Sequence, residues 1–275
     1  MLMKEAENET IEVDLLLEAA FQRYGYDFRN YARATIKRRV HALVEETKSQ
    51  SPSALIPGIL HDKSLFMRLV SALSVTVTDL FRDPLFYREL REQVMPTLST
   101  YPYFKIWHAG CATGEEPYSM AILLEEEKLY HRARIYGTDM NNDSLEKARA
   151  GIFDLKTMKQ GQANYVKSGG RLPFSDYYHA GYGGAQLGNR FSDNITFSRH
   201  NLTSDSSFGE MNMIVCRNVL IYFNRQLKDR VLTLFSDSLC HRGFLCLGTK
   251  ESLQFTCLKD NFEVVSEAQR IYRKL

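Results

Sequence analysis

The first part of the chain carries hydrophobic residues at helical spacing. In residues 11–25, "IEVDLLLEAAFQRYG", the apolar side chains fall on one helical face and the run ends at a glycine, which is typical of an amphipathic helix with a glycine stop. The same pattern predicts helices over about 29–46 and 62–71, and the Ser-Pro pair at 51–52 favours a short helix between them. Residues 1–83 are therefore predicted to form an all-helical N-terminal domain.

From residue 103 onward, short apolar runs alternate with amphipathic segments. Alternating strands and helices imply a mostly parallel sheet with helices on both faces. We predict a domain junction at Asp83-Pro84, a bridging helix over 84–102 and an α/β domain over 103–275. The predicted strands are 104–109, 133–139, 194–202, 211–218 and 243–249, with further strand sequence in 262–275.

One segment, about 155–193, interrupts this alternation. It is long for a connection and rich in glycine and tyrosine, as in "GQANYVKSGGRLPFSDYYHAGYGGAQLGNR". A long loop inside a compact domain usually has a structure or a function of its own. We predict an inserted subdomain with a small antiparallel β-sheet.

Composition narrows the class of protein without naming a function. The 275 residues are 44% hydrophobic and 25% charged, as in globular proteins, and no apolar run reaches the length of a membrane span. The N-terminus has no signal-peptide core, so we expect a cytoplasmic protein without membrane insertion. A net charge of +2 gives no reason to expect nucleic-acid binding. The five cysteines show no metal-like spacing, so no metal site is predicted.

The stretch "FKIWHAGCATGEEPYSMA", residues 104–121, predicts a strand, a turn and a helix start. It lacks both nucleotide-binding glycine fingerprints, but Gly110 and Gly114 would let the backbone approach a ligand closely. Glu115 and Glu116 would repel a pyrophosphate and suit a cationic ligand, such as a sulfonium or an ammonium group.

Asp139 ends the second predicted strand, where an acidic side chain can accept hydrogen bonds from ribose hydroxyls. Together with the carboxylates of the turn, it points to a ribose-bearing cofactor without phosphates, and S-adenosylmethionine fits. Asn201-Leu202 and Arg217-Asn218 follow two further strands, within reach of an adenine and an amino-acid moiety. The alternative is an ordinary α/β domain with helix-capping carboxylates and asparagines that only form turns.

Four motifs in order resemble one known family over nearly the whole chain. They are "FRDPLFYREL", "GCATGEEPYSMA", "YGTDMNNDSLEKARAGIF" and "CRNVLIYFN", and they look like the chemotaxis-receptor methyltransferase (CheR) family. The resemblance implies a Rossmann-like methyltransferase domain that transfers a methyl group from S-adenosylmethionine to glutamate side chains of chemoreceptors, with S-adenosylhomocysteine as the other product.

The resemblance also implies roles for individual residues. Arg82 and Tyr222 take the catalytic positions, and Thr76 stands where the family usually has asparagine. "LGTKESL" also departs from the family pattern, and we assign Thr249 and Lys250 no role. The implied cofactor contacts, including the glycine of the turn, are Thr76, Thr78, Arg82, Gly110, Glu116, Asp139, Asn201, Leu202, Arg217 and Asn218.

The implied chemistry needs no general base, because a glutamate carboxylate has an ordinary pKa of about 4.3 and is already ionised at neutral pH. The donor is a sulfonium, so opposite charges neutralise during the displacement, and a partly desolvated, aligned site helps. We expect Arg82 to orient the incoming carboxylate and Tyr222 to line the path of the methyl group.

A basic run in the second predicted helix is the candidate receptor-binding surface. Side chains four residues apart share a helical face, and such a charge run is often only a solvated surface. The resemblance implies that this helix recognises glutamate-rich receptor helices by steering. The cations concerned are Arg29, Arg33, Lys37, Arg38 and Arg39, whereas Tyr31, Ile36 and Val40 are expected to face the core.

In some family members the inserted subdomain binds a peptide at the receptor C-terminus. The sequence "YYHAGYGGAQLGNR" is glycine-rich without matching that type clearly, so we expect no dependence on such a tether. Two other functions stay open. A nucleic-acid methyltransferase often carries prolines after the fourth strand, where this chain reads "CRNVLIYF". The other is a non-catalytic adaptor that binds S-adenosylmethionine or a second messenger, and the intact pocket residues argue against such a loss of catalysis.

Overall fold

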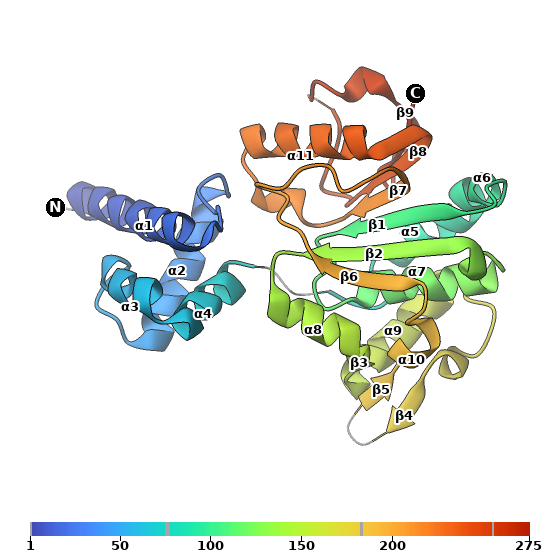
Figure 1. Cartoon of the computed structure of the whole chain (residues 1–275), viewed down its shortest axis with the longest axis horizontal. Coiled ribbons are helices and arrows are strands. Elements are labelled where there is room, and N and C mark those ends of the chain that lie inside the picture. The colour runs from blue at the N-terminus through green and yellow to red at the C-terminus, as the bar shows by residue number, and fades with distance from the viewer. Residues whose placement is uncertain (1, 75–77, 182–183, 255) are drawn as a thin grey trace. The chain divides into compact units, whose positions relative to one another are not determined.

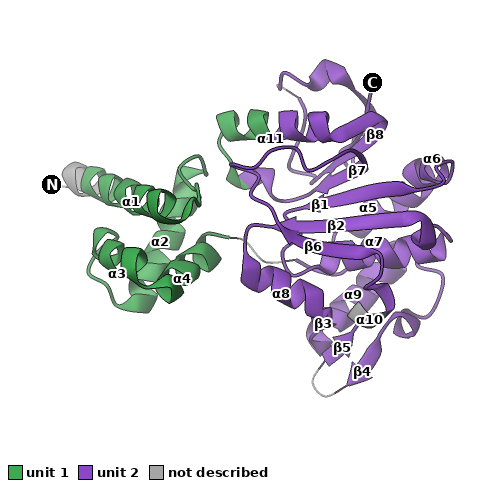
Figure 2. Ribbon diagram, viewed as in Figure 1, with its two compact units in different colours: residues 1–76, 222–230 green, residues 77–221, 231–275 purple. Residues whose placement is uncertain are grey.

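The computed structural model describes residues 2–74, 78–181, 184–254 and 256–275. Two compact units are present, one of residues 1–76 and 222–230 and the other of 77–221 and 231–275 (Figure 2). The predicted bridging segment 84–102 lies inside the second unit. A short piece of the predicted α/β domain, 222–230, belongs to the first.

The first unit is helical, as predicted. Buried side chains of α1 such as Leu16 and of α4 such as Leu69 form its core together with Ile36 and Val40 of α2. Tyr31 is buried with them. The helices are α1 (Leu2–Tyr24), α2 (Arg33–Thr47), η1 (Ser53–Leu55), α3 (Ile56–His61) and α4 (Lys63–Leu73).

The prediction that the second helix starts near Arg29 is wrong, because α2 begins at Arg33. Asp27 accepts the backbone N–H of Arg29 at 3.0 Å, and such a bond stabilises a turn rather than a helix. Ala32 is extended, and its N–H donates to the carbonyl of Tyr222 at 2.7 Å. Arg29 therefore does not share a helical stripe with Arg33. The same backbone contact attaches 222–230 to the first unit.

The second unit contains a seven-stranded sheet in the order β6-β2-β1-β7-β8-β10-β9 (Figure 1). All pairs from β6 to β8 are parallel, and β10 is antiparallel to both neighbours. The predicted, mostly parallel α/β sheet is thus confirmed. Its strands are β1 (Phe104–Ala109), β2 (Ala133–Asp139), β6 (Ile195–Arg199), β7 (Met211–Cys216), β8 (Leu239–Leu247), β9 (Phe262–Ser266) and β10 (Ile271–Lys274).

Helices cover both faces of this sheet (Figure 1). Ile106 of β1 joins the core formed with the apolar residues of α7, whereas the next residue, Trp107, points to the other face and contacts Phe235 of α11 with ring centroids 5.4 Å apart. These helices are α7 (Glu115–Glu126), α8 (Asn142–Ala150) and α11 (Arg225–Ser238). The segment 84–98 forms α5 (Pro84–Glu89), a π-helical turn (Leu90–Val94) and α6 (Met95–Leu98), and short 3-10 turns lie at Tyr130–Arg132, Leu220–Tyr222 and Lys259–Asn261.

The inserted subdomain contains the predicted antiparallel sheet, in the order β3-β5-β4, but it starts at Ile152 and its largest element is a helix. Asp154 caps that helix, α9, by accepting the N–H of Thr157 at 2.7 Å. The elements are β3 (Ile152–Phe153), α9 (Leu155–Lys167), η4 (Phe174–Tyr177), β4 (His179–Gly181), β5 (Gly184–Gln186) and α10 (Gly188–Phe191).

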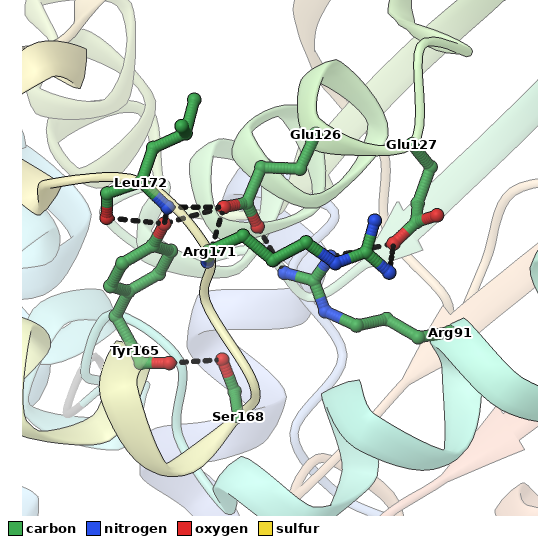
Figure 3. A network of polar contacts seen from close by, with 7 residues as sticks. All are labelled: Arg91, Glu126, Glu127, Tyr165, Ser168, Arg171 and Leu172. Carbon is green, nitrogen blue, oxygen red and sulfur yellow. Dashed lines mark hydrogen bonds and ion pairs between the residues drawn. The ribbon is translucent and has the colours of Figure 1, made fainter.

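A buried polar network fixes this subdomain to the C-terminus of α7 (Figure 3). Glu126, with a side chain only 1% exposed, is paired with Arg91 of the π-helical turn. It also lies 2.5 Å from the hydroxyl of Tyr165 on α9 and accepts the N–H of Arg171 at 2.7 Å. Arg91 contacts Glu127 as well, at 2.8 Å. Because the carboxylate is buried, each of these partners helps to offset its lost hydration.

We predict that Tyr165→Phe lowers the free energy of unfolding by about 1–3 kcal/mol, since it leaves a buried carboxylate short of one donor. Urea unfolding followed by the fluorescence of Trp107, the only tryptophan of the chain, reports on the second unit. Tyr103→Phe is the matched control, because the Tyr103 side chain is an exposed one at 78%. Equal midpoints for the two variants would contradict the assigned role of the network.

Candidate functional site

The predicted cofactor residues of the α/β domain gather at the carboxyl edge of the sheet. Gly110 follows β1, Asp139 ends β2, and Arg217 follows β7. Ala109 pairs with Thr138, and Asp139 with Arg199, so the ends of β1, β2 and β6 are level. This edge is where open α/β sheets bind ligands. The residues placed here are Gly110, Glu116, Asp139, Asn201, Leu202, Arg217 and Asn218.

The turn after β1 depends on Gly110. Its φ of 78° lies in the left-handed region, and its N–H donates to the carbonyl of Thr138 at 2.8 Å. A Cβ atom at this position would lie 2.6 Å from Cγ2 of Val219 in the loop after β7. Glycine therefore allows two strand ends to approach each other closely.

Asp139 is held in an orientation that fits a ribose. Its Oδ2 accepts the N–H of Ala112 at 3.0 Å, and its Oδ1 accepts the N–H of Asn141 at 2.9 Å. The backbone N–H of Met140 also hydrogen-bonds this carboxyl group. A carboxylate can accept about four hydrogen bonds, so capacity for a ligand hydroxyl remains.

Asn201 presents an unused donor. Its side-chain oxygen accepts the N–H of Thr203 at 3.0 Å and the hydroxyl of the same residue at 2.8 Å. Its Nδ2 is buried and has no hydrogen-bond partner among the residues that the structure describes. Buried donors are nearly always satisfied, so this atom fits an acceptor on a ligand, as an adenine nitrogen would be. Leu202 is also buried and offers apolar contact.

Glu116 belongs to a buried charged cluster. Its Oε1 lies 2.8 Å from Nδ1 of His108 and its Oε2 lies 3.3 Å from Nη1 of Arg217. Burial alone would raise the pKa of Glu116, but the hydrogen bond with His108 and the charge of Arg217 outweigh it and hold that pKa below its ordinary value. Glu116 is therefore an ionised carboxylate at neutral pH.

Arg217 connects this cluster to the segment before α5. Its side chain is 2% exposed, stacks 4.1 Å from the centroid of Phe86, and contacts Asp83 at 2.6 Å. It also donates to the backbone carbonyl of Arg82 at 3.3 Å. His108 is not among the site residues predicted from the sequence, and Asp83 is predicted only as a domain boundary. A polar residue in the apolar strand "FKIWHA" was the available signal for His108.

The segment that carries Thr78 and Arg82 is fixed from two further sides. The N–H of Phe81 donates to the hydroxyl of Ser119 on α7 at 2.8 Å, and the carbonyl of Leu80 accepts from Nδ2 of Asn164 on α9 at 3.0 Å. Thr78 itself is half-buried. Thr76, another predicted cofactor contact, lies outside the described residues.

Glu115 differs from its neighbour. It is 6% exposed, and its carboxylate accepts a hydrogen bond from the hydroxyl of Thr113 at 2.7 Å. Burial raises the pKa of Glu115 to about 7. Of the two carboxyl groups that the sequence predicts to suit a cation, Glu116 is therefore the more fully ionised at neutral pH.

Tyr222 and the five cations lie in the first unit. Tyr222 is half-buried at the end of the turn Leu220–Tyr222. Four of the five cations already have partners there. Arg29 pairs with Glu18 and Asp27, Arg33 with Asp14, Lys37 with Thr10, and Arg39 with the carbonyls of Ala72 and Ser74, whereas Arg38 is exposed and has no partner in the described ranges.

The strand order and the cofactor edge define a methyltransferase with a Rossmann-like fold. Residues 76–271 match the model described as "CheR methyltransferase, SAM binding domain", and residues 11–74 match "CheR methyltransferase, all-alpha domain". The chain belongs to the CheR methyltransferase family, and its cofactor is S-adenosylmethionine.

Several curated relatives agree with this family. The chain is 48% identical to "Putative methyltransferase Cher3" of Pseudomonas putida over 99% of its own length and 100% of that protein. It is 33% identical to "Chemotaxis protein methyltransferase 1" of Vibrio cholerae over 84% of both chains. It is 31% identical to "Chemotaxis protein methyltransferase 1" of Pseudomonas aeruginosa, over 84% of this chain and 85% of the relative.

The described residues contain neither a candidate metal site nor a candidate membrane-spanning helix. No cluster of His, Cys, Asp and Glu side chains within the described residues could hold a metal ion. In the same parts of the chain, no helix combines the length and the apolar character that crossing a membrane requires.

We predict that Glu115 makes the second unit less stable as the pH rises. A carboxyl group with a raised pKa binds its proton more tightly in the folded state, so its stabilising effect grows as the pH falls from about 7 towards the ordinary value of 4.5. Between about pH 5.5 and 8.5, wild type should therefore lose up to about 2 kcal/mol of unfolding free energy relative to Glu115→Gln.

Urea unfolding followed by Trp107 fluorescence at several pH values measures this difference. Glu125→Gln is the control, because Glu125 lies on the same helix with a side chain 39% exposed. A constant difference between wild type and Glu115→Gln across the pH range would refute the assignment.

Proposed function

We propose that this enzyme transfers a methyl group from S-adenosylmethionine to glutamate side chains of chemoreceptor proteins and produces glutamate methyl esters. The observation that carries the proposal is the charged cluster in which the buried Arg217 contacts Glu116 and the partly exposed Asp83, beside the carboxyl edge of the sheet. It joins the segment of Arg82 to the cofactor residues, in a chain that resembles chemotaxis protein methyltransferases over most of its length. Chemoreceptors present these glutamates in the cytoplasm, so the enzyme acts there.

The residues at the edge fit the cofactor. Asp139 has spare acceptor capacity for a ribose hydroxyl, and the buried Nδ2 of Asn201 suits an acceptor on the adenine. Glu116 supplies a fixed negative charge near the turn, which suits the positively charged methionine part. When bound, S-adenosylmethionine supplies an electrophilic methyl group, which a carboxylate oxygen takes up while the carbon–sulfur bond breaks.

The protein has no proton to remove from the acceptor, since a glutamate is already ionised at neutral pH. Its task is to hold a carboxylate in line and to exclude water. Arg82 is the residue we assign to the carboxylate. Its backbone is fixed by Arg217 through the carbonyl contact, while a guanidinium forms strong paired hydrogen bonds with carboxylates. Tyr222 is assigned to the path of the methyl group.

A transfer assay tests the function directly. A cytoplasmic receptor fragment is incubated with tritiated S-adenosylmethionine, and the label is released as methanol by mild base, which cleaves methyl esters. A fragment with glutamine at the acceptor positions is the control. Base-stable label in added nucleic acid would support the nucleic-acid methyltransferase, and cofactor binding without any transfer would support the adaptor.

We predict that Arg82→Ala lowers kcat about 100-fold and weakens S-adenosylhomocysteine binding far less, because an orienting charge acts mainly in the transition state. Steady-state methylation and calorimetry measure the two effects. Arg88→Ala is the control, since Arg88 is exposed and, among the described residues, hydrogen-bonds the carbonyl of Lys167 at the surface. Arg82 loses this role if kcat stays at the wild-type value.

The candidate receptor-binding surface of this enzyme is not a stripe of unpaired cations. Arg33 and Asp14 are 51% and 45% exposed, and such surface pairs contribute only about 0–1 kcal/mol, so a receptor glutamate can replace Asp14 at little cost. Arg39 is committed to two backbone carbonyls at the end of α4. We therefore assign first contact with the receptor to Arg38 and Arg33, and a structural role to Arg39.

We predict that Arg38→Ala raises the KM for the receptor fragment about fivefold, equivalent to about 1 kcal/mol, without changing the KM for S-adenosylmethionine. The rise of KM with added salt should also become less steep, because one screened attraction is missing. Arg68→Ala provides the comparison, since Arg68 is also a cation of the first unit with a side chain 48% exposed. Equal KM values for both variants would exclude Arg38 from the interface.

A further inference from the structure

A buried carboxylate outside the predicted site accepts hydrogen bonds from the backbone at the carboxyl edge of the sheet. Glu251 follows β8 and is 5% exposed. Its Oε2 accepts the N–H groups of Gly248 at 2.6 Å and of Asn218 at 3.1 Å, and its Oε1 accepts the N–H of Ile221 at 3.2 Å. Within the described residues it has no cationic partner.

These N–H groups partly offset the burial of the carboxyl group. Burial raises the pKa of Glu251, and the backbone N–H groups of Gly248, Asn218, Ile221 and Leu220 oppose that effect. Backbone N–H groups that are buried need an acceptor. An apolar side chain at this position would leave them all unsatisfied, so the carboxylate and the loop require each other.

The loop concerned is the one that follows β7. Asn218 has a φ of 62°, in the left-handed region that asparagine adopts more readily than most residues other than glycine. The next residue is Val219. Its side chain packs against Gly110, where a Cβ atom would collide with it. Ile221 directly precedes Tyr222. One carboxylate therefore constrains both ends of this short loop.

Gly248 makes this contact possible. A Cβ atom there would lie 2.8 Å from Oε2 of Glu251 and 2.9 Å from the backbone nitrogen of Asn218. Both distances are shorter than real Cβ contacts. The end of β8 thus approaches the loop so closely that only glycine fits, which is independent support for a built contact.

We propose that Glu251 is a positioning residue of the cofactor pocket. It ties the loop after β7 to the end of β8 and fixes the backbone from which the Asn218 side chain projects. The proposal rests on cofactor binding at this edge and not on the identity of the methyl acceptor. Its test can therefore use S-adenosylhomocysteine alone, without any receptor.

The test begins with Glu251→Gln. The amide keeps the size of the side chain but turns one acceptor oxygen into a donor that faces backbone N–H groups. We expect the Kd of S-adenosylhomocysteine, measured by calorimetry, to rise about tenfold, on the scale of one lost hydrogen bond to a charged group. In methylation assays the KM for S-adenosylmethionine should rise and the KM for the receptor should not.

A double-mutant cycle separates positioning from general destabilisation. If Glu251 acts through Asn218, Glu251→Gln should have almost no further effect on the Kd in an Asn218→Ala background. Tyr165→Phe is the control for stability, because it weakens the same unit from a different buried network. Gly248→Ala keeps the carboxylate but forces the end of β8 away from the loop after β7, so it should reproduce the loss of affinity. It replaces Glu251→Gln in the test if that variant does not fold.

Three results would overturn the proposal. The first is an unchanged Kd in Glu251→Gln, with Gly248→Ala also unchanged. The second is additive effects of Glu251→Gln and Asn218→Ala. The third is an equal loss of affinity in Tyr165→Phe. A receptor that is never methylated would count against the proposed acceptor and would leave each of these binding results intact.

Discussion

The candidate site depends on the contacts that the buried guanidinium of Arg217 makes. This guanidinium lies between Glu116 of α7, Asp83 before α5 and the carbonyl of Arg82, and it stacks on Phe86. A buried cation is tolerable only with such partners. Three separate stretches of sequence are consequently held together by one charge, and Arg82 can be rigid although the backbone around it is not part of a regular element.

The division of labour between the two adjacent glutamates follows from the same cluster. Glu116 remains charged because His108 and Arg217 contact it, whereas Glu115 faces Thr113 in a poorly solvated position. The turn after β1 therefore contributes one permanent negative charge instead of two. The charge of Glu116 has a partner in Arg217, whereas a second buried charge without a partner would cost stability.

Much of this arrangement could be predicted from the sequence. The strand and helix order follows from local periodicity, and the residues at strand ends meet because parallel strands share an edge. Asp83 and Glu251 could not be found in this way, because each contacts a partner distant in sequence. His108 contacts Glu116 only eight residues away, and the signal for it was a polar residue in an apolar strand. The start of α2 was missed because the bond from Arg29 to the Asp27 side chain competes with helix formation. The pairing of the basic residues with α1 also arises only when two helices pack together.

The contact of α9 with the segment before α5 has a consequence for how such enzymes diversify. Asn164 donates to the carbonyl of Leu80, and a Cβ atom on Gly161 would lie only 2.8 Å from Cβ of Leu80. The inserted subdomain is thus packed against the segment before α5 and is not structurally independent of it. An insertion exchanged between relatives would bring a different support for residues 80–82, so the two segments are expected to evolve as one module, and a graft would need both.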